Sequence, residues 1–188
     1  MHNYTVSVTR QSDPQFVSFP FRFEATIHLP ADEVWAQWVE TVTNYRESWL
    51  WPTQYSQPTV DQSPPRAGGR LTLTYQIPNP NNPDGPKKNA TYEFDLLEWD
   101  DMARAFSYRA TPEHPFLAGG GHLSVSVIDD RHCRFVWAGE YKHVNQHEGK
   151  EAQGDVFAYF LCMFFTAMAQ NIKKKVGYDD APAPTTPG

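Results

Sequence analysis

The sequence predicts an α+β fold, in which an antiparallel sheet packs against one long helix at the end of the chain. Segments that alternate between apolar and polar residues follow one another with short turns between them, which is typical of antiparallel hairpins. The stretch 156–169 then carries no charged residue, and the basic cluster Lys173 to Lys175 follows it, as expected for the last turn of a helix. Helices that cover one face of such a sheet define the α+β class.

The first half of the chain is predicted to contain two strands and two short helices. Residues 1–20 read as an irregular lead, in which 4–9 is a candidate edge strand. The segment 21–29 alternates as a half-buried strand and ends at Pro30. A helix follows from Asp32, and a second short helix over 44–51 is stopped by Pro52. We expect a loop over 53–69 and a strand over 70–77, where alternate residues are again apolar.

The second half is predicted to contain two hairpins before the long helix. Residues 78–86 are rich in proline, asparagine and glycine and predict an exposed turn. The hairpins pair 90–99 with 104–110, turning at Asp100 and Asp101, and 122–128 with 132–143, turning at Asp129 and Asp130. Between them we expect a loop over 111–121 that ends in three glycines. We expect one domain over 1–180 and a disordered tail over 181–188.

The apolar run in the last helix indicates a buried helix. Its 14 or so residues would span about 21 Å, which is short of the roughly 20 residues that a bilayer requires. A helix that is apolar all round is buried on more than one side. A cavity between such a helix and a curved sheet would suit an apolar small molecule, so we expect a hydrophobic or aromatic ligand and no membrane insertion.

Composition and charge exclude several classes of protein. The formal net charge is −6, which argues against a nucleic-acid surface. The first residues have neither a basic region nor an apolar region of a secretory signal, and two cysteines are too few for a disulfide framework, so we expect a cytoplasmic protein. The excess apolar surface of the last helix leaves a partner-binding module, including a homodimer, as a further alternative.

The sequence carries no cofactor or metal motif. No phosphate-binding loop, dinucleotide-binding glycine pattern, paired-cysteine motif or Gly-x-Ser-x-Gly elbow occurs. His143 and His147 are four residues apart with Glu148 beside them, but they fall where a strand ends, so their rings need not share a face. We therefore expect no cofactor and no metal.

Three segments resemble one superfamily. The opening strand running into Pro30 to Trp35, the start of the strand at Gly68 to Leu71, and the strand 133–141 are similar to the START/Bet v 1-like helix-grip superfamily, SRPBCC, which includes polyketide cyclases and aromatases. The resemblance spans roughly residues 20–177. It implies a helix-grip fold, in which a curved antiparallel sheet of about seven strands wraps around the C-terminal helix and encloses a hydrophobic cavity. It does not imply one chemistry, because members include cyclases, carriers and co-chaperones.

Strand alternation selects the candidate site residues. Buried hydroxyls require partners, so several tyrosines on one inner face indicate contacts to an oxygenated ligand. Our catalytic candidates are His143, Tyr141, Tyr75 and Tyr108. Our ligand-binding candidates are Trp49, Trp51, Phe106, Trp137, Tyr159, Phe160 and Met163. On the last helix, the stripe with Tyr159, Phe160 and Met163 and the stripe with Phe157, Leu161, Phe164 and Met168 are alternatives for the face that meets the sheet.

Two functional hypotheses follow. In the first, the protein is a cyclase, aromatase or dehydratase acting on a polyketide-like or other aromatic intermediate. A histidine titrates near neutral pH, so His143 would serve as the base, and a tyrosine would donate a hydrogen bond to the developing enolate oxygen. In the second, the protein is a carrier that binds a hydrophobic small molecule or lipid without chemistry. In both, an apolar pocket lies between helix and sheet, with Trp137 and Met163 in its wall.

Overall fold

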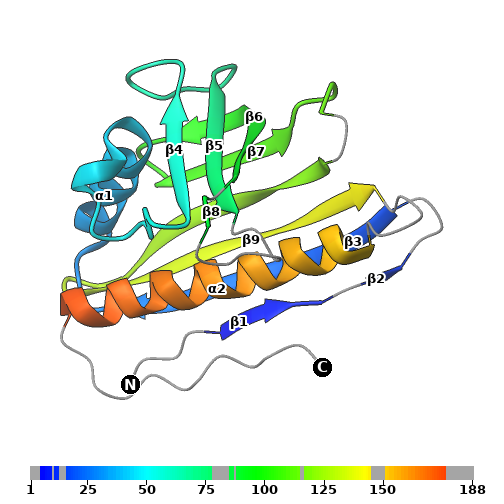
Figure 1. Cartoon of the computed structure of the whole chain (residues 1–188). Helices are drawn as coiled ribbons and strands as arrows, with labels where there is room; N and C mark the ends of the chain where they lie inside the picture. Colours follow the sequence, from blue (N-terminus) through cyan, green and yellow to red (C-terminus); the bar gives the residue numbers. More distant parts are fainter. Residues whose placement is uncertain are drawn as a thin grey trace.

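A curved antiparallel sheet wraps along one long helix in the computed structural model (Figure 1). The helix is α2 (Glu151–Val176), and the shorter α1 (Ala31–Thr43) and the 3-10 turn η1 (Tyr45–Glu47) lie at one end of the sheet. The fold is the α+β helix-grip arrangement that the sequence predicts. The structure describes residues 5–9, 11–12, 16–77, 85–86, 88–114, 117–144 and 151–176.

The sheet has nine strands within the described residues. They are β1 (Thr5–Val8), β2 (Gln11–Ser12), β3 (Phe16–Ile27), β4 (Ser56–Val60), β5 (Arg70–Ile77), β6 (Lys88–Asp100), β7 (Ala105–Ala110), β8 (Leu117–Asp129) and β9 (His132–Val144). Their order is β1-β3-β9-β8-β7-β6-β5-β4, and β2 also pairs with β3. Every pair is antiparallel. From β5 to β9, sequence neighbours pair with each other, as local antiparallel connections allow.

The burial of residues along α2 shows which of its two apolar stripes meets the sheet. Phe157, Leu161, Phe164 and Met168 are buried, whereas Tyr159 is 68% exposed. The stripe through Phe157 therefore faces the sheet, with Phe160 and Phe165 beside it. No helix within the described residues is both long and apolar enough to span a membrane.

Three segments predicted to be irregular contain further strands, which corrects the expected count of about seven. In the lead over 1–20, β1 confirms the candidate edge strand over 4–9, whereas β2 and the first five residues of β3 were not expected. Val6 and Val8 of β1 are buried. The predicted loop over 53–69 contains β4, which tolerates Pro58 because it is the last strand of the sheet. The three glycines 119–121, expected to end a loop over 111–121, lie inside β8 and pair with β9.

The predicted helix over 44–51 is also wrong, because only the single turn η1 forms there. By contrast, the strand predicted over 70–77 is β5, and both aspartate turns separate the strands that they were expected to separate. Outside the described residues lie most of the predicted turn 78–86, His147 with Glu148, and the predicted tail 181–188.

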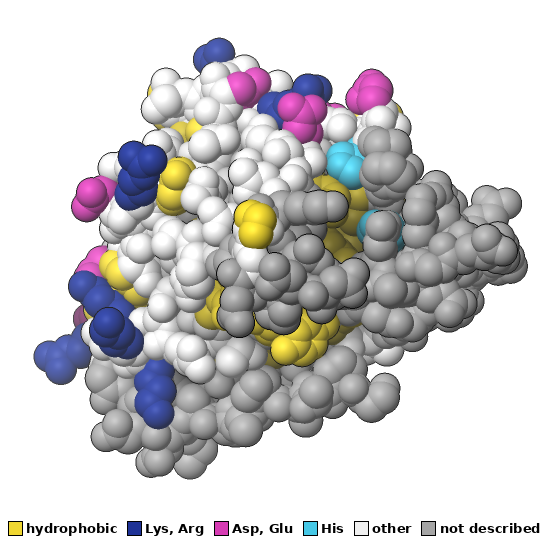
Figure 2. Space-filling view, in the orientation of Figure 1, with side chains coloured by type: hydrophobic (Ala, Val, Ile, Leu, Met, Phe, Trp, Pro, Cys, Tyr) yellow, Lys and Arg dark blue, Asp and Glu magenta, His cyan; other side chains and the backbone are white. Residues whose placement is uncertain are grey.

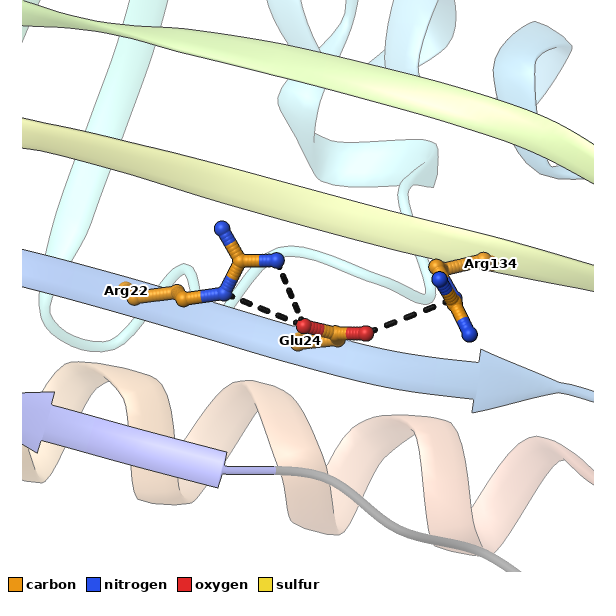
Figure 3. Close-up of polar contacts among 3 residues, drawn as sticks. All are labelled: Arg22, Glu24 and Arg134. Atoms are coloured by element: carbon orange, nitrogen blue, oxygen red, sulfur yellow. Dashed lines mark hydrogen bonds and ion pairs between the residues drawn. The ribbon is translucent and has the colours of Figure 1, made fainter.

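The outer face of the sheet is polar, which orients the inner face toward α2. Phe21 and Phe23 of β3 are buried, and the alternate residues Arg22 and Glu24 point outward. Figure 3 shows Glu24 between two arginines: Arg22 Nη2 lies 2.6 Å from one carboxylate oxygen, and Arg134 Nε of β9 lies 3.3 Å from the other. The alternate residues of these strands, which are aromatic at Phe21 and Phe23, therefore lie on the inner face.

Candidate functional site

Three buried tyrosines from three strands form the polar centre of the inner face. Tyr75 of β5, Tyr108 of β7 and Tyr141 of β9 are each at most 6% exposed. The Tyr108 and Tyr141 hydroxyl oxygens lie 2.5 Å apart, and the indole N–H of Trp137 donates to the Tyr108 hydroxyl oxygen at 2.9 Å. Tyr75 lies on the same inner face, and it contributes to the raised pKa of Tyr141. Strand alternation placed all three on the inner face, and the curl of the sheet brings them together.

The direction of these hydrogen bonds leaves a donor available. The Trp137 N–H can only donate, so the Tyr108 oxygen accepts from it. If Tyr108 then donates to Tyr141, the Tyr141 hydrogen remains free for another acceptor; if Tyr141 donates, the Tyr108 hydrogen remains. In either case the pair offers one polarised O–H to a ligand oxygen.

These hydroxyls are neutral donors at physiological pH. Burial raises the pKa of Tyr75 and of Tyr141 well above the usual value of a tyrosine, and the neighbouring tyrosines raise both further. Burial also raises the pKa of Tyr108, although its hydrogen bonds with Tyr141 and Trp137 act in the opposite direction. The cluster therefore suits donation to a developing oxyanion and does not suit proton abstraction.

A glycine of β8 makes room for the Tyr108 hydroxyl. A Cβ at position 121 would lie 2.8 Å from that hydroxyl oxygen and 3.1 Å from both the Ala138 carbonyl oxygen and the Phe21 ring. Such a separation is shorter than a Cβ makes with a hydroxyl oxygen, so any larger residue would displace Tyr108. Gly121 is thus part of the site, although it bears no functional group.

Two histidines lie at the edge of this cluster. His143, on the same face of β9 as Tyr141, is buried, and its ring centroid lies 6.3 Å from that of Phe157. His114 stacks on Tyr92 with ring centroids 5.1 Å apart, and Tyr92 in turn meets Phe157 at 6.2 Å. The face of the molecule drawn in Figure 2 shows histidine side chains, not assigned to individual residues there, next to hydrophobic side chains.

His114 is held beside His143 by the backbone of β8. The N–H of Leu117 donates to His114 Nδ1 at 3.0 Å, and Leu117 is the register partner of His143. Burial lowers the pKa of His114, and the nearby His143 lowers it further. A neutral His114 therefore carries its hydrogen on Nε2.

Aromatic rings enclose the tyrosine cluster on the side of α2 and α1. Phe160 meets the Tyr75 ring at 4.7 Å, and Phe164 meets Trp51 at 4.7 Å. Trp51 lies 5.8 Å from Trp137. Phe106 stacks on Tyr108 at 5.5 Å. The predicted residues Trp51, Phe106, Trp137 and Phe160 are thus in one buried cluster with the tyrosines.

Tyr159 lies away from the predicted site, and Trp49 and Met163 are only partly buried. Tyr159, expected to line the site, is exposed and points away from the sheet. Trp49 packs against the edge of the core, and the Lys175 ammonium group near the end of α2 lies 5.7 Å from the centroid of its ring. Met163 is half-buried. The helix is apolar all round, so its sequence did not determine which side meets the sheet.

The sequence reasoning missed His114 and Gly121. Both fall in the segment 111–121, which was expected to be a loop, so neither was assigned to the inner face. The sequence held only a weak signal for Gly121. A glycine within a strand often marks the close approach of another group, but residues 119–121 were not predicted to lie in a strand.

Comparison with known families fits this geometry. Residues 19–177 match the model of the family described as polyketide cyclase / dehydrase and lipid transport. The chain belongs to this family. No curated protein matches it in sequence.

Solved structures show the same fold at low identity. Norcoclaurine synthase from Thalictrum flavum, in complex with dopamine and hydroxybenzaldehyde, is 17% identical with a TM-score of 0.53, covering 89% of this chain and 91% of that one. The aromatase/cyclase Zhui from a Streptomyces species is 14% identical with a TM-score of 0.53, covering 85% and 94%. One di-domain aromatase/cyclase, BexL, is 18% identical with a TM-score of 0.54, covering 83% of this chain and 45% of that one. At these identities the likeness establishes the helix-grip fold.

Proposed function

We propose that this protein is a cofactor-independent cyclase, aromatase or dehydratase that acts on a polyketide-like or other aromatic intermediate. The observation that carries the proposal is the hydrogen-bonded pair of neutral tyrosine hydroxyls from β7 and β9, with the buried Tyr75 of β5 and a buried histidine on the same inner face. Membership of a family described as polyketide cyclase / dehydrase supports the same class of reaction. The ligand is a hydrophobic or aromatic small molecule.

The proposed reaction begins with removal of an acidic C–H proton next to a carbonyl group. His143 takes the proton, the C–H electron pair moves into the carbonyl group, and an enolate forms. The free O–H of the Tyr108–Tyr141 pair, or that of Tyr75, donates a hydrogen bond to the enolate oxygen. The enolate carbon then attacks a second carbonyl carbon of the same chain, which forms the ring bond and leaves an alkoxide that recovers a proton.

Loss of water from that alcohol would complete an aromatic ring. A further C–H proton leaves to a base, the C–O bond breaks, and the hydroxide takes a proton and departs as water. His114 lies beside His143, so the edge of the site holds two imidazoles for these transfers. Enclosure by Phe160, Phe164 and Trp51 would hold a flexible chain in one reactive conformer, which lowers the barrier by several kcal/mol at best.

Product analysis tests this proposal. The protein is supplied with linear poly-β-ketone chains released by a minimal polyketide synthase, and the products are separated by liquid chromatography and mass spectrometry. Tyr141→Phe is expected to slow formation of the cyclised product by roughly 10²-fold, as does loss of one oxyanion donor elsewhere, and His143→Phe by a similar or larger factor. The exposed Tyr159→Phe serves as the matched control and leaves the rate unchanged. Unchanged cyclisation in the Tyr141→Phe, His143→Phe double variant refutes the mechanism.

A non-catalytic carrier is the second candidate, favoured by the reference to lipid transport in the family description. The two functions differ in what happens to a bound ligand. A carrier returns its ligand chemically unchanged after long incubation, whereas the proposed enzyme returns a ring-closed or dehydrated product. Native mass spectrometry of protein purified from its own host would identify a co-purified ligand and decide which assay to run.

A further inference from the structure

One fully buried hydroxyl in the sheet has no hydrogen-bond partner among the residues that the structure describes. Among the described residues, the buried side-chain polar atoms without a partner are Ser56 Oγ and Trp38 Nε1. Ser56 is 0% exposed. A buried hydroxyl left unpaired destabilises a folded protein, and such groups are uncommon in native structures.

The contrast with Thr41 shows what a buried hydroxyl in this protein ordinarily does. Thr41 is equally buried, yet its Oγ1 donates to the Gln37 carbonyl oxygen at 2.8 Å and lies 2.7 Å from Ser48 Oγ. Its position in α1 satisfies it locally. The Trp38 ring is surrounded by the rings of Trp51, Phe106 and Trp137, so its neighbours are aromatic.

Ser56 stands on the wall of the candidate site. It opens β4 directly opposite Tyr75 of β5, and residues opposite each other in an antiparallel pair project from the same face. Its backbone carbonyl accepts the indole N–H of Trp51 at 2.9 Å, which fixes its position between Trp51 and Tyr75. Both of those residues meet rings of α2, namely Phe164 and Phe160. The Ser56 hydroxyl therefore faces the interior that α2 covers.

This hydroxyl lies on a different wall from the Tyr108–Tyr141 pair. The strand β4 ends the sheet, and β5, β6, β7 and β8 separate it from β9. Tyr75 of β5 lies beside Ser56, between it and the pair in the strand order. The inner face thus carries one polar group at Ser56, next to Tyr75, and a second polar centre at the Tyr108–Tyr141 pair.

We propose that Ser56 Oγ is a specificity-determining contact that binds a second oxygen of the ligand, at the end away from the Tyr108–Tyr141 pair. The inference rests on the proposed function and narrows its substrate class. The ligand carries oxygens at two separated positions, as a polyhydroxylated or polyketonic aromatic does, and is not a lipid with a single polar end. A hydroxyl both donates and accepts, so Ser56 suits either a phenol or a ketone. Ligand binding then supplies the partner that the described residues do not offer.

A pair of probes and a matched pair of variants test this inference. The probes are naphthalene-2,6-diol, with a hydroxyl on each ring, and 2-naphthol, which lacks one of them. Binding is followed by quenching of tryptophan fluorescence, and stability by thermal unfolding of the ligand-free protein. The variants are Ser56→Ala, which removes the unpaired hydroxyl, and Thr41→Val, which removes a buried hydroxyl that has partners.

The two variants are expected to change in opposite directions. Ser56→Ala raises the Tm by about 2–4 °C, because an unpaired buried group is removed from a domain of this size. It also weakens diol binding by about fivefold, the worth of one neutral hydrogen bond, and leaves 2-naphthol binding unchanged. Thr41→Val lowers the Tm and leaves the preference for the diol unchanged.

Each other outcome overturns the inference. A lower Tm in Ser56→Ala shows that the hydroxyl has a structural partner, and an unchanged diol preference shows that it does not touch the ligand. Equal weakening of both probes points to a general packing effect. If neither probe binds the wild-type protein, this inference fails, and the cyclisation assay then decides separately whether the proposed function fails with it.

Discussion

Replacing Gly121 with alanine should break the hydrogen bonds of the tyrosine cluster, although no polar side chain is replaced. The added Cβ would lie 2.8 Å from the Tyr108 hydroxyl oxygen, so the Tyr108 side chain must move. That movement disrupts its bonds to Tyr141, at 2.5 Å, and to Trp137, at 2.9 Å. At about 0.5–1.5 kcal/mol for each neutral hydrogen bond, we expect a loss of about 1–3 kcal/mol in the free energy of unfolding.

A double-mutant cycle separates this effect from ordinary crowding. Tyr108→Phe removes the hydroxyl that the new methyl group meets, while the 3.1 Å contacts with Ala138 and Phe21 remain in both backgrounds. The free energies of unfolding of the four proteins are measured by urea denaturation. We expect Gly121→Ala to cost at least about 1 kcal/mol less in the Tyr108→Phe background. An equal cost in both backgrounds would refute the claim that Gly121 makes room for the hydroxyl.

Two further predictions concern the edge of the site and its cover. The pKa of His114 is lowered in the folded protein, so below about pH 6.5 the unfolded chain binds more protons and stability falls as the pH drops. His114→Gln should flatten this fall between pH 7 and pH 5 in urea titrations, and an unchanged slope would contradict the assigned burial. Phe164→Ala should cost about 3–5 kcal/mol because Phe164 is buried against Trp51, whereas Tyr159→Ala on the exposed side of α2 should stay within about 0.5 kcal/mol. Similar losses in the two variants would mean that α2 is rotated.

The sequence determined the parts of the fold that depend on local patterns. The strand β5 alternates cleanly between apolar and polar residues, so its limits agreed with the prediction. The hairpins turn at paired aspartates, which strands disfavour. The strand β4 could not be recognised, because Pro58 argues against a strand unless the strand is known to lie at the edge of the sheet.

The candidate site was predicted in composition but not in arrangement. Alternation assigned Tyr75, Tyr108 and Tyr141 to the inner face, and all three are buried there. Their meeting depends on the curl of the sheet across five strands from β5 to β9, which no local pattern encodes. The rotation of α2 was equally hidden, since both of its stripes carry aromatic residues and only packing exposes Tyr159.

A crystal structure of the protein with bound naphthalene-2,6-diol tests the central claim most directly. The account predicts that the diol lies between α2 and the inner face of the sheet, with one oxygen within hydrogen-bond distance of the Tyr75, Tyr108 or Tyr141 hydroxyl. A diol bound elsewhere on the protein, with the Tyr108–Tyr141 and Trp137–Tyr108 hydrogen bonds unchanged and no ligand atom near them, would contradict it.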